Sequence, residues 1–194
     1  MARSEQKLSE LRVIAGRWRG RKIRFPAHGI RPTGDRVRET LFNWLAPHLP
    51  GARCLDLFAG SGALGIEALS RGAEHVVFVE RQARAAAAIA EHLQDFGAVP
   101  VDYAVLTSDA LKLDIKAHGP FDVVFVDPPF SADSGIDLAN LCTLLHESRA
   151  LAPQALVYLE MDRAAALPPL PAGWEVSREK TAGQVRYALA QVED

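Results

Sequence analysis

From residue 53 onward, short apolar runs alternate with longer helical patterns, and this alternation is the strongest constraint on the fold. The runs suit strands that are buried on both faces, and they are Cys54–Phe58, His75–Val79, Val101–Leu106, Phe121–Val126 and Ala155–Leu159. Helical patterns between them cover 62–71, 82–95, 110–117 and 135–150. The alternation predicts a parallel, doubly wound α/β sheet with its ligand site at the carboxyl ends of the strands.

Both ends of the chain depart from this alternation. Trp174–Arg178 and Val185–Leu189 are consecutive strand patterns with Gly183 between them, which predicts a C-terminal antiparallel hairpin and brings the sheet to seven strands. Before the sheet, apolar residues at helical spacing predict a helix over Asp35–Leu45, which Pro47 and Pro50 would stop.

The N-terminal segment is strongly basic, although the whole chain has a net charge of only −2. Residues 1–38 contain eleven Lys and Arg against three acidic residues, so this segment carries +8 and the rest of the chain −10. A basic arm on an acidic body is typical of a protein that docks on phosphates through one part. A solvated basic tail is the alternative.

Within this arm the residue pattern predicts a β-hairpin. Leu11–Ala15 and Arg21–Phe25 would be its strands, and Gly16–Gly20 its five-residue loop, with Arg17, Trp18 and Arg19 at the tip. We therefore predict two parts: a basic arm over residues 1–30 that docks on phosphates, and an α/β domain over residues 31–194.

The composition agrees with a folded cytoplasmic protein. The 194 residues are 48% hydrophobic and 24% charged, and no apolar run approaches the roughly 20 residues that a membrane span needs. Cys54 and Cys142 lie in apolar segments, which predicts buried thiols in a reducing compartment. Neither these cysteines nor the six histidines have metal-ligand spacing, so we expect no metal. Because no long apolar run is present, we also expect no membrane partner.

A glycine-rich turn follows the first strand of the sheet. Gly60, Gly62 and Gly65 match the dinucleotide-binding fingerprint, in which backbone N–H groups approach a ligand at a helix N-terminus. Glu80, at the end of the next strand, is placed to accept hydrogen bonds from ribose hydroxyls. These features suit NAD and S-adenosylmethionine equally.

Three further features favour S-adenosylmethionine. Asp56, just before the turn, would repel a pyrophosphate but suits an ammonium and a nearby sulfonium. Asp109 and the N–H of Ala110 could pair with adenine, although Asp109 could equally be a helix N-cap. The fourth strand runs into Asp127-Pro-Pro-Phe130, for which a dehydrogenase has no need.

The Asp127-Pro-Pro-Phe130 tetrapeptide fits methylation of an amine on a nucleic-acid base. The lone pair of such a nitrogen is delocalised into the ring, and acceptors around the –NH₂ group can favour a pyramidal nitrogen. The Asp127 carboxylate and the Pro128 carbonyl are the predicted acceptors, and paired prolines fix the direction of that carbonyl. Phe130 would stack on the base.

Several segments resemble known methyltransferases. Leu55–Gly62, Phe78–Glu80 and Asp127–Phe130 look like the motifs of amino-methyltransferases on the Rossmann-like class I scaffold. With Arg31–Leu45, the arm Arg12–Arg21 and Lys180–Tyr187, nearly the whole chain resembles the RsmD family, bacterial methyltransferases that act on a guanine 2-amino group of small-subunit ribosomal RNA. This resemblance implies 16S ribosomal RNA as the partner, alone or within the small subunit or its precursor.

The resemblance also implies roles for individual residues. The predicted catalytic set is Asp127, Pro128, Pro129 and Phe130. The predicted cofactor-binding set is Thr33, Asp35, Arg36, Asp56, Phe58, Ala59, Gly60, Ser61, Gly62, Glu80, Asp109 and Ala110. The predicted RNA-binding set is Arg12, Arg17, Trp18, Arg19, Arg21, Lys22 and Arg38.

Other functions remain open on the residues alone. The motif suits an N6-adenine DNA methyltransferase or a protein glutamine methyltransferase, but 194 residues leave no obvious DNA-recognition domain, and the basic arm would be surplus for a protein substrate. A non-catalytic RNA-binding protein on the same scaffold is a further alternative, which the intact Asp127–Phe130 motif disfavours.

Overall fold

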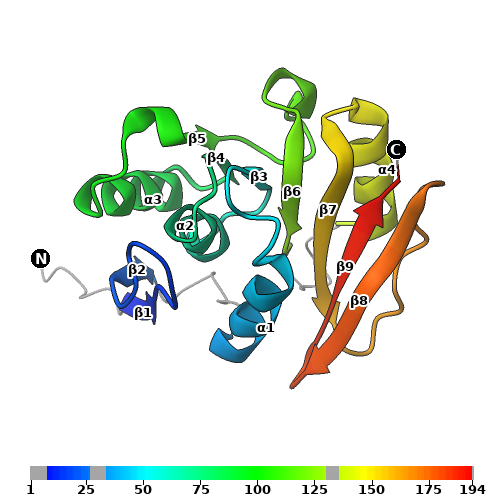
Figure 1. The fold of residues 1–194 in the computed structure, drawn as a ribbon, viewed down its shortest axis with the longest axis horizontal. Helices are drawn as coiled ribbons and strands as arrows, with labels where there is room; N and C mark the ends of the chain where they lie inside the picture. The colour runs from blue at the N-terminus through cyan, green and yellow to red at the C-terminus, as the bar shows by residue number, and fades with distance from the viewer. Residues whose placement is uncertain (1–7, 27–33, 130–135, 194) are drawn as a thin grey trace, which may run out of the picture.

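The computed structural model describes residues 8–26, 34–129 and 136–193. Thr33 and Phe130, which the sequence places in the site, lie outside these residues. The described chain forms a two-stranded N-terminal sheet and a seven-stranded sheet with helices on both faces (Figure 1). The strands are β1 Leu8–Arg12, β2 Lys22–Pro26, β3 Arg53–Asp56, β4 His75–Glu80, β5 Tyr103–Thr107, β6 Phe121–Val126, β7 Leu151–Asp162, β8 Trp174–Ala182 and β9 Val185–Val192. The helices are α1 Asp35–Leu45, α2 Ala63–Ser70, α3 Ala83–Asp95 and α4 Leu138–Ser148, with short 3₁₀ turns η1 Pro100–Asp102 and η2 Ile115–Ala117.

The large sheet has the predicted topology. Its strand order is β5-β4-β3-β6-β7-β9-β8, in which the first five strands are parallel and β9 is antiparallel to both β7 and β8. The order reverses between β3 and β6, and in open α/β sheets such a switch point is where ligands bind. The predicted seven-stranded, mostly parallel sheet with a C-terminal hairpin is therefore confirmed.

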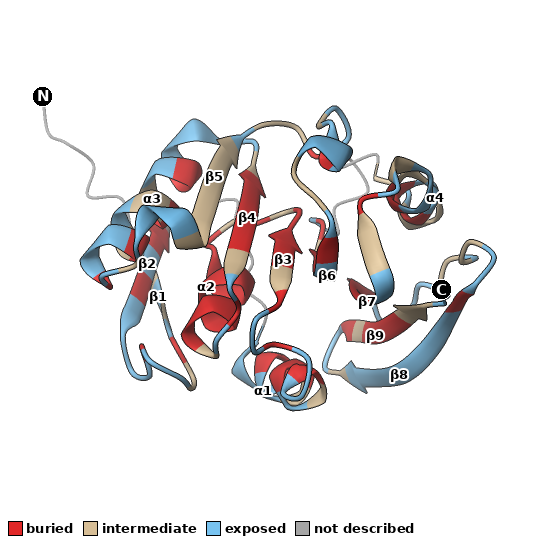
Figure 2. Cartoon of the chain, turned by 45° about the horizontal axis from the view of Figure 1, so that its top comes forward, coloured by how far each residue is buried: buried red, intermediate tan, exposed pale blue. Residues whose placement is uncertain are grey.

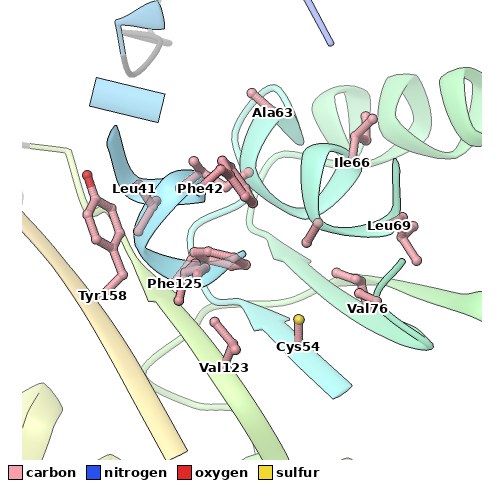
Figure 3. Close-up of a cluster of buried hydrophobic side chains, with 14 of the residues drawn as sticks. Leu41, Phe42, Cys54, Ala63, Ile66, Leu69, Val76, Val123, Phe125 and Tyr158 are labelled. Carbon is pink, nitrogen blue, oxygen red and sulfur yellow. The ribbon is translucent and has the colours of Figure 1, made fainter. Parts of the chain in front are cut away.

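Apolar cores lie on both faces of the sheet. Figure 3 shows part of the first core, where Phe42 of α1 and Ile66 of α2 lie over Phe125 of β6 and Cys54 of β3. The second core packs α4 and η2 against the opposite face. Burial is highest in the central strands and in α2, while edge strand β8 is largely exposed (Figure 2). Cys54 and Cys142 are buried and free, as predicted.

Helix α2 is buried at every position because the N-terminal arm covers the side that faces away from the sheet. All eight of its residues are buried, including the polar Glu67 and Ser70. The arm contributes Val13, Trp18, Ile23 and Phe25 to the same core as α2. Figure 1 shows β1 and β2 beside α2 and α3. The arm is thus packed into the first core of the protein.

The contact between arm and α2 is polar as well as apolar. The Glu67 carboxylate accepts hydrogen bonds from the backbone N–H groups of Ile14 (2.7 Å) and Ala15 (3.0 Å). The Ser70 hydroxyl donates to the Ala15 carbonyl (2.6 Å) and accepts from the Trp18 N–H (3.0 Å). We call Glu67 and Ser70 together the α2 clasp.

The α2 clasp explains one error of the sequence analysis. The first arm strand was predicted at Leu11–Ala15 but lies at Leu8–Arg12. It pairs with β2 along its whole length, from Leu8 opposite Pro26 to Arg12 opposite Lys22. Ile14 and Ala15 cannot continue the ladder because their N–H groups bond to Glu67. The predicted five-residue loop is therefore replaced by a longer connection over residues 13–21.

A second error concerns residues 110–117, which were predicted as a helix. The structure has only η2 at Ile115–Ala117. The Asp109 carboxylate accepts from the Leu111 N–H (3.1 Å), and the Lys112 N–H donates to the Asp109 carbonyl (3.0 Å), so the segment starts as a turn.

The first prediction concerns the α2 clasp. Glu67 has no exposed side-chain surface, and its carboxylate also pairs with Arg71 (2.7 Å) and lies 3.8 Å from the buried Arg38. Glu67→Ala should lower the free energy of unfolding by about 3–5 kcal/mol, because it leaves a buried cation and two backbone N–H groups without their acceptor. Urea unfolding measures this loss, and hydrogen exchange should become faster at the amides of Ile14 and Ala15. The control is Glu74→Ala on the exposed surface; an equal effect in both variants would contradict the role of the clasp.

Candidate functional site

A cleft of about 1160 Å³ opens at the carboxyl ends of the parallel strands. Its walls come from the turns after β3, β4, β5 and β6, from the end of β7, from the start of α1 and from the β8–β9 turn. Its volume exceeds the roughly 300–1,000 Å³ of most small-molecule sites, so it has room for a cofactor and a second group.

The turn between β3 and α2 forms the floor of this cleft. Gly60 and Gly62 have φ values of +53° and +77°, a region that favours glycine. The Asp56 carboxylate accepts from the Gly65 N–H in the first turn of α2 (3.0 Å), and the Ala59 N–H donates to the Val79 carbonyl (2.9 Å). The turn is thus tied both to its own helix and to the neighbouring strand β4.

Glu80 makes a second connection across the floor. One carboxylate oxygen accepts from the Gly60 N–H (2.8 Å) and the other from the Gln82 N–H (2.7 Å). A carboxylate offers about four acceptor positions, so both oxygens keep capacity for the two hydroxyls of a ribose. Glu80 therefore holds the glycine turn and still lines the cleft.

Asp56 is a buried carboxylate that lines the cleft. Burial raises the pKa of Asp56 to about 7; the Gly65 N–H opposes this rise, while the charges of Asp127 and Glu80 add to it. A cation in the cleft would favour the ionised form, so the group is suited to an ammonium ligand.

The start of the predicted catalytic motif faces the same cleft. Asp127, Pro128 and Pro129 follow β6 directly and line it together with Asp56 and Ser61. Their position follows from the sheet, because β3 and β6 are adjacent and parallel with Asp56 opposite Phe125. The structure thus brings the motif and the glycine turn together across the switch point.

Most of the predicted cofactor-binding residues meet in this cleft. Those that line it are Asp56, Phe58, Ala59, Gly60, Ser61, Glu80, Asp109 and Ala110. Three others do not line it. Gly62 faces Ile66 and Ile89, while Asp35 and Arg36 are exposed on α1. From the start of α1, Gly34 and Val37 line the cleft instead.

Two predicted RNA-binding residues are in the interior. Trp18 is only 5% exposed, because its ring packs beside Phe96 (5.7 Å between centroids) and beneath the Arg17 guanidinium (4.3 Å). Arg38 is fully buried and donates to Asp35 (2.6 Å) and to the Arg12 carbonyl (3.0 Å). The predictions that these two side chains face RNA are therefore wrong for this structure.

The other predicted RNA-binding residues are exposed on the arm. They are Arg12, Arg17, Arg19, Arg21 and Lys22. Arg17 pairs with Asp102 (3.2 Å), Lys22 pairs with Glu10 (2.8 Å), and Arg21 donates to the Asp95 carbonyl (2.6 Å). Arg21 also lies over the ring of Phe96 (4.6 Å).

One wall of the cleft was not predicted from the sequence. This wall consists of Glu160 and Asp162 from β7 and of Ala182–Val185 in the β8–β9 turn. A signal was available: Glu160 and Asp162 are acidic residues just after the apolar run Ala155–Leu159, at the carboxyl end of a strand.

Comparison with known proteins identifies the family. Residues 11–191 match the family described as "Conserved hypothetical protein 95". Ribosomal RNA small subunit methyltransferase D of Escherichia coli is 45% identical over 95% of this chain and 91% of its own length, and the Haemophilus influenzae protein of that name is 45% identical over 94% of each. The chain therefore belongs to the family described as "Conserved hypothetical protein 95".

Solved structures agree with this membership. The protein yhhF from Escherichia coli superposes with a TM-score of 0.85 at 43% identity, over 95% of this chain and 99% of its own. SMU.776, whose structure is a complex with SAH, shares only 14% identity but has the same fold, with a TM-score of 0.70 over 88% of this chain and 53% of its own. The predicted Rossmann-like methyltransferase fold is confirmed.

S-adenosylmethionine fits the residues that line the cleft. Asp56, Glu80 and Asp127 are acidic groups around a single cavity, which suits the ammonium and sulfonium of this cofactor. The same charges would repel the pyrophosphate of NAD. The cofactor prediction therefore agrees with the family, the fold and the charge of the site.

The second prediction uses the pKa of Asp56. Its folded-state pKa is raised to about 7, so the carboxylate is mostly protonated below that pH and mostly ionised above it. Because the cationic cofactor needs the ionised form, its affinity should fall about tenfold for each pH unit below the pKa. Calorimetric titration with S-adenosylmethionine at several pH values measures this slope.

The matched control for this titration is Asp56→Asn. This variant should bind more weakly at neutral pH and should lose the slope, because no titrating carboxylate remains at that point of the cleft. A slope that persists in Asp56→Asn would assign the pH dependence to another group.

Proposed function

We propose that this protein transfers the methyl group of S-adenosylmethionine to the exocyclic 2-amino group of a guanine in small-subunit (16S) ribosomal RNA. One observation carries the proposal: the Asp127-Pro128-Pro129 segment and the glycine turn line the same cleft, from the adjacent strands β6 and β3. The relatives named ribosomal RNA small subunit methyltransferase D support an RNA substrate. The choice of guanine as the target base rests on the resemblance of the sequence to the RsmD family.

The chemistry needs acceptors and alignment. When bound, S-adenosylmethionine supplies a methyl group on a sulfonium, and transfer leaves a neutral thioether, an N-methyl amine and one released proton. The Asp127 carboxylate and the Pro128 carbonyl accept from the –NH₂ group and favour the pyramidal nitrogen. The glycine turn and Glu80 position the cofactor, so orientation supplies most of the rate.

The substrate side of the proposal rests on the arm. Residues 1–30 contain eight Lys and Arg against two acidic residues, and the described part of the arm is fixed to α2 by the α2 clasp. A fixed basic surface on the arm can dock phosphates while one base enters the cleft. The substrate can be the RNA alone or the RNA within the small subunit or its precursor.

Mapping the methylated nucleotide tests this function. Small subunits that lack the modification are incubated with the protein and labelled S-adenosylmethionine, after which the RNA is digested to nucleosides and the proteins to amino acids. We expect the label in N2-methylguanosine at a single position. Label in N6-methyladenosine or in methylglutamine would overturn the guanine assignment in favour of another amine.

The third prediction concerns the acceptor role of Asp127. Asp127→Ala should retain S-adenosylmethionine binding but lower kcat by about 100-fold or more, because the side-chain acceptor beside the reacting amine is lost. Single-turnover methylation of small subunits measures the rate, and calorimetry measures cofactor affinity. Asp95→Ala, on the exposed end of α3, is the control. Undiminished turnover in Asp127→Ala would refute the acceptor role.

The fourth prediction concerns the arm. Arg19 is exposed in the connection between β1 and β2, whereas Arg17 and Arg21 also hold the arm in place. Arg19→Ala should weaken RNA binding without unfolding the arm, and the log–log dependence of affinity on salt should become shallower by about 0.7–0.9 for one lost phosphate contact. Binding to 16S ribosomal RNA over a salt series measures the slope. An unchanged slope would place the phosphate contacts elsewhere.

A further inference from the structure

Glu160 lies beside the catalytic motif on the neighbouring strand. Strands β6 and β7 are parallel, with Val126 opposite Leu159, so Glu160 of β7 lies at the level where Asp127 follows β6. Neighbouring strands are about 4.8 Å apart, which places the two acidic residues side by side at the carboxyl edge of the sheet. Both line the cleft, and Glu160 is only 3% exposed, at its inner wall.

Tyr158 anchors this carboxylate. The Tyr158 hydroxyl donates to one oxygen of Glu160 at 2.6 Å. Burial raises the pKa of Tyr158 well above its ordinary value, and the charges of Glu160 and Asp127 add to this effect, so the hydroxyl stays a donor. Figure 3 shows Tyr158 beside Phe125, within the packed face of the sheet. Tyr158 therefore fixes the position of the Glu160 carboxylate, which offers about four acceptor positions in all.

A second carboxylate beside Asp127 matches the edge of a guanine. Guanine carries an N1–H donor next to its 2-amino group, so that edge offers donors at two adjacent nitrogens. Resting on the proposed function, we infer that Glu160 accepts the N1–H of the target guanine while Asp127 and Pro128 hold the amine. Glu160 is then the residue that selects a purine with a donor at N1.

The inference predicts which bases are refused. Adenine and 2-aminopurine present a lone pair at N1, and a buried carboxylate opposite a lone pair has no proton to share. A site built to accept a hydrogen bond discriminates strongly against an analogue that lacks the donor, because its polar group is left unpaired. 2-Aminopurine is the sharper probe, because it keeps the 2-amino group that receives the methyl.

The fifth prediction is therefore a specificity ratio. Small-subunit RNA is ligated from synthetic pieces so that the mapped nucleotide is guanosine or 2-aminopurine riboside, and is then assembled into particles. The wild-type protein should favour guanosine in kcat/KM by about 10- to 100-fold, the range of one hydrogen bond to a charged acceptor. Glu160→Gln should lower that ratio about tenfold, since the neutral amide can still bond to Tyr158 but can also donate to the N1 lone pair.

The ratio separates specificity from folding. Both substrates are measured on one preparation of each protein, so a loss of folded protein cancels. 2-Aminopurine also lacks the O6 atom of guanine, but that difference is the same for both proteins and leaves the change between them to residue 160. Glu91→Gln, exposed on α3, is the control and should keep the wild-type ratio.

The outcomes distinguish the two proposals. If the wild-type protein methylates guanosine, but its kcat/KM ratio of guanosine to 2-aminopurine riboside equals that of Glu160→Gln, the role of Glu160 is overturned and the proposed function stands. A wild-type ratio near one would do the same. A wild-type protein that transfers no methyl group to the guanosine particles would instead overturn the proposed function.

Discussion

The position of the N-terminal arm on the rest of the protein depends on the hydrogen bonds and ion pairs of the Glu67 carboxylate. This carboxylate has no exposed surface, and it accepts from two backbone N–H groups of the arm and from Arg71 while it lies near the buried Arg38. A buried charge is tolerated only when it is paired and hydrogen-bonded, so these partners must be in place together. One carboxylate on α2 thereby sets the position of the arm and links it to α1.

The consequence for the site lies at the other end of the same helix. Because the arm covers α2 on one side and the sheet covers it on the other, the helix has little freedom to shift. Gly65 shows how closely it lies on the sheet, since a Cβ there would be 2.2 Å from the Phe78 ring. The glycine turn that begins α2 is therefore fixed in relation to β4 and β6. Fixed geometry of this kind is what a reaction driven by orientation requires.

The sequence was informative wherever a pattern is local. Helix α1 has the predicted ends, β6 has the predicted bounds, and Phe58–Ser61 of the glycine turn line the expected cleft. Periodicity and turn chemistry act over a few residues, so they can be read without a structure.

The errors have long-range causes. Ile14 bonds to a residue 53 positions away, and this bond takes it out of the predicted strand. Trp18 is buried because Phe96 and α2 lie beneath it, and nothing in the neighbouring sequence indicates that. Glu160 gained its significance only when the sheet placed it beside Asp127. These contacts depend on which elements become neighbours, and a local pattern does not contain that information.

Charge divides the molecule into two surfaces with different tasks. The cleft is lined by Asp56, Glu80, Asp127 and Glu160, whereas the arm carries exposed Arg and Lys side chains. An acidic cleft attracts a cationic cofactor but repels the phosphates of a nucleic acid, so a polynucleotide backbone cannot follow its base into the site. Under the proposed function, a target base would leave its stack and enter the cleft alone, while its backbone stays outside the cleft. The free energy needed to unstack the base would then have to come from contacts outside the cleft, and a basic surface held firmly on the protein is suited to supply them.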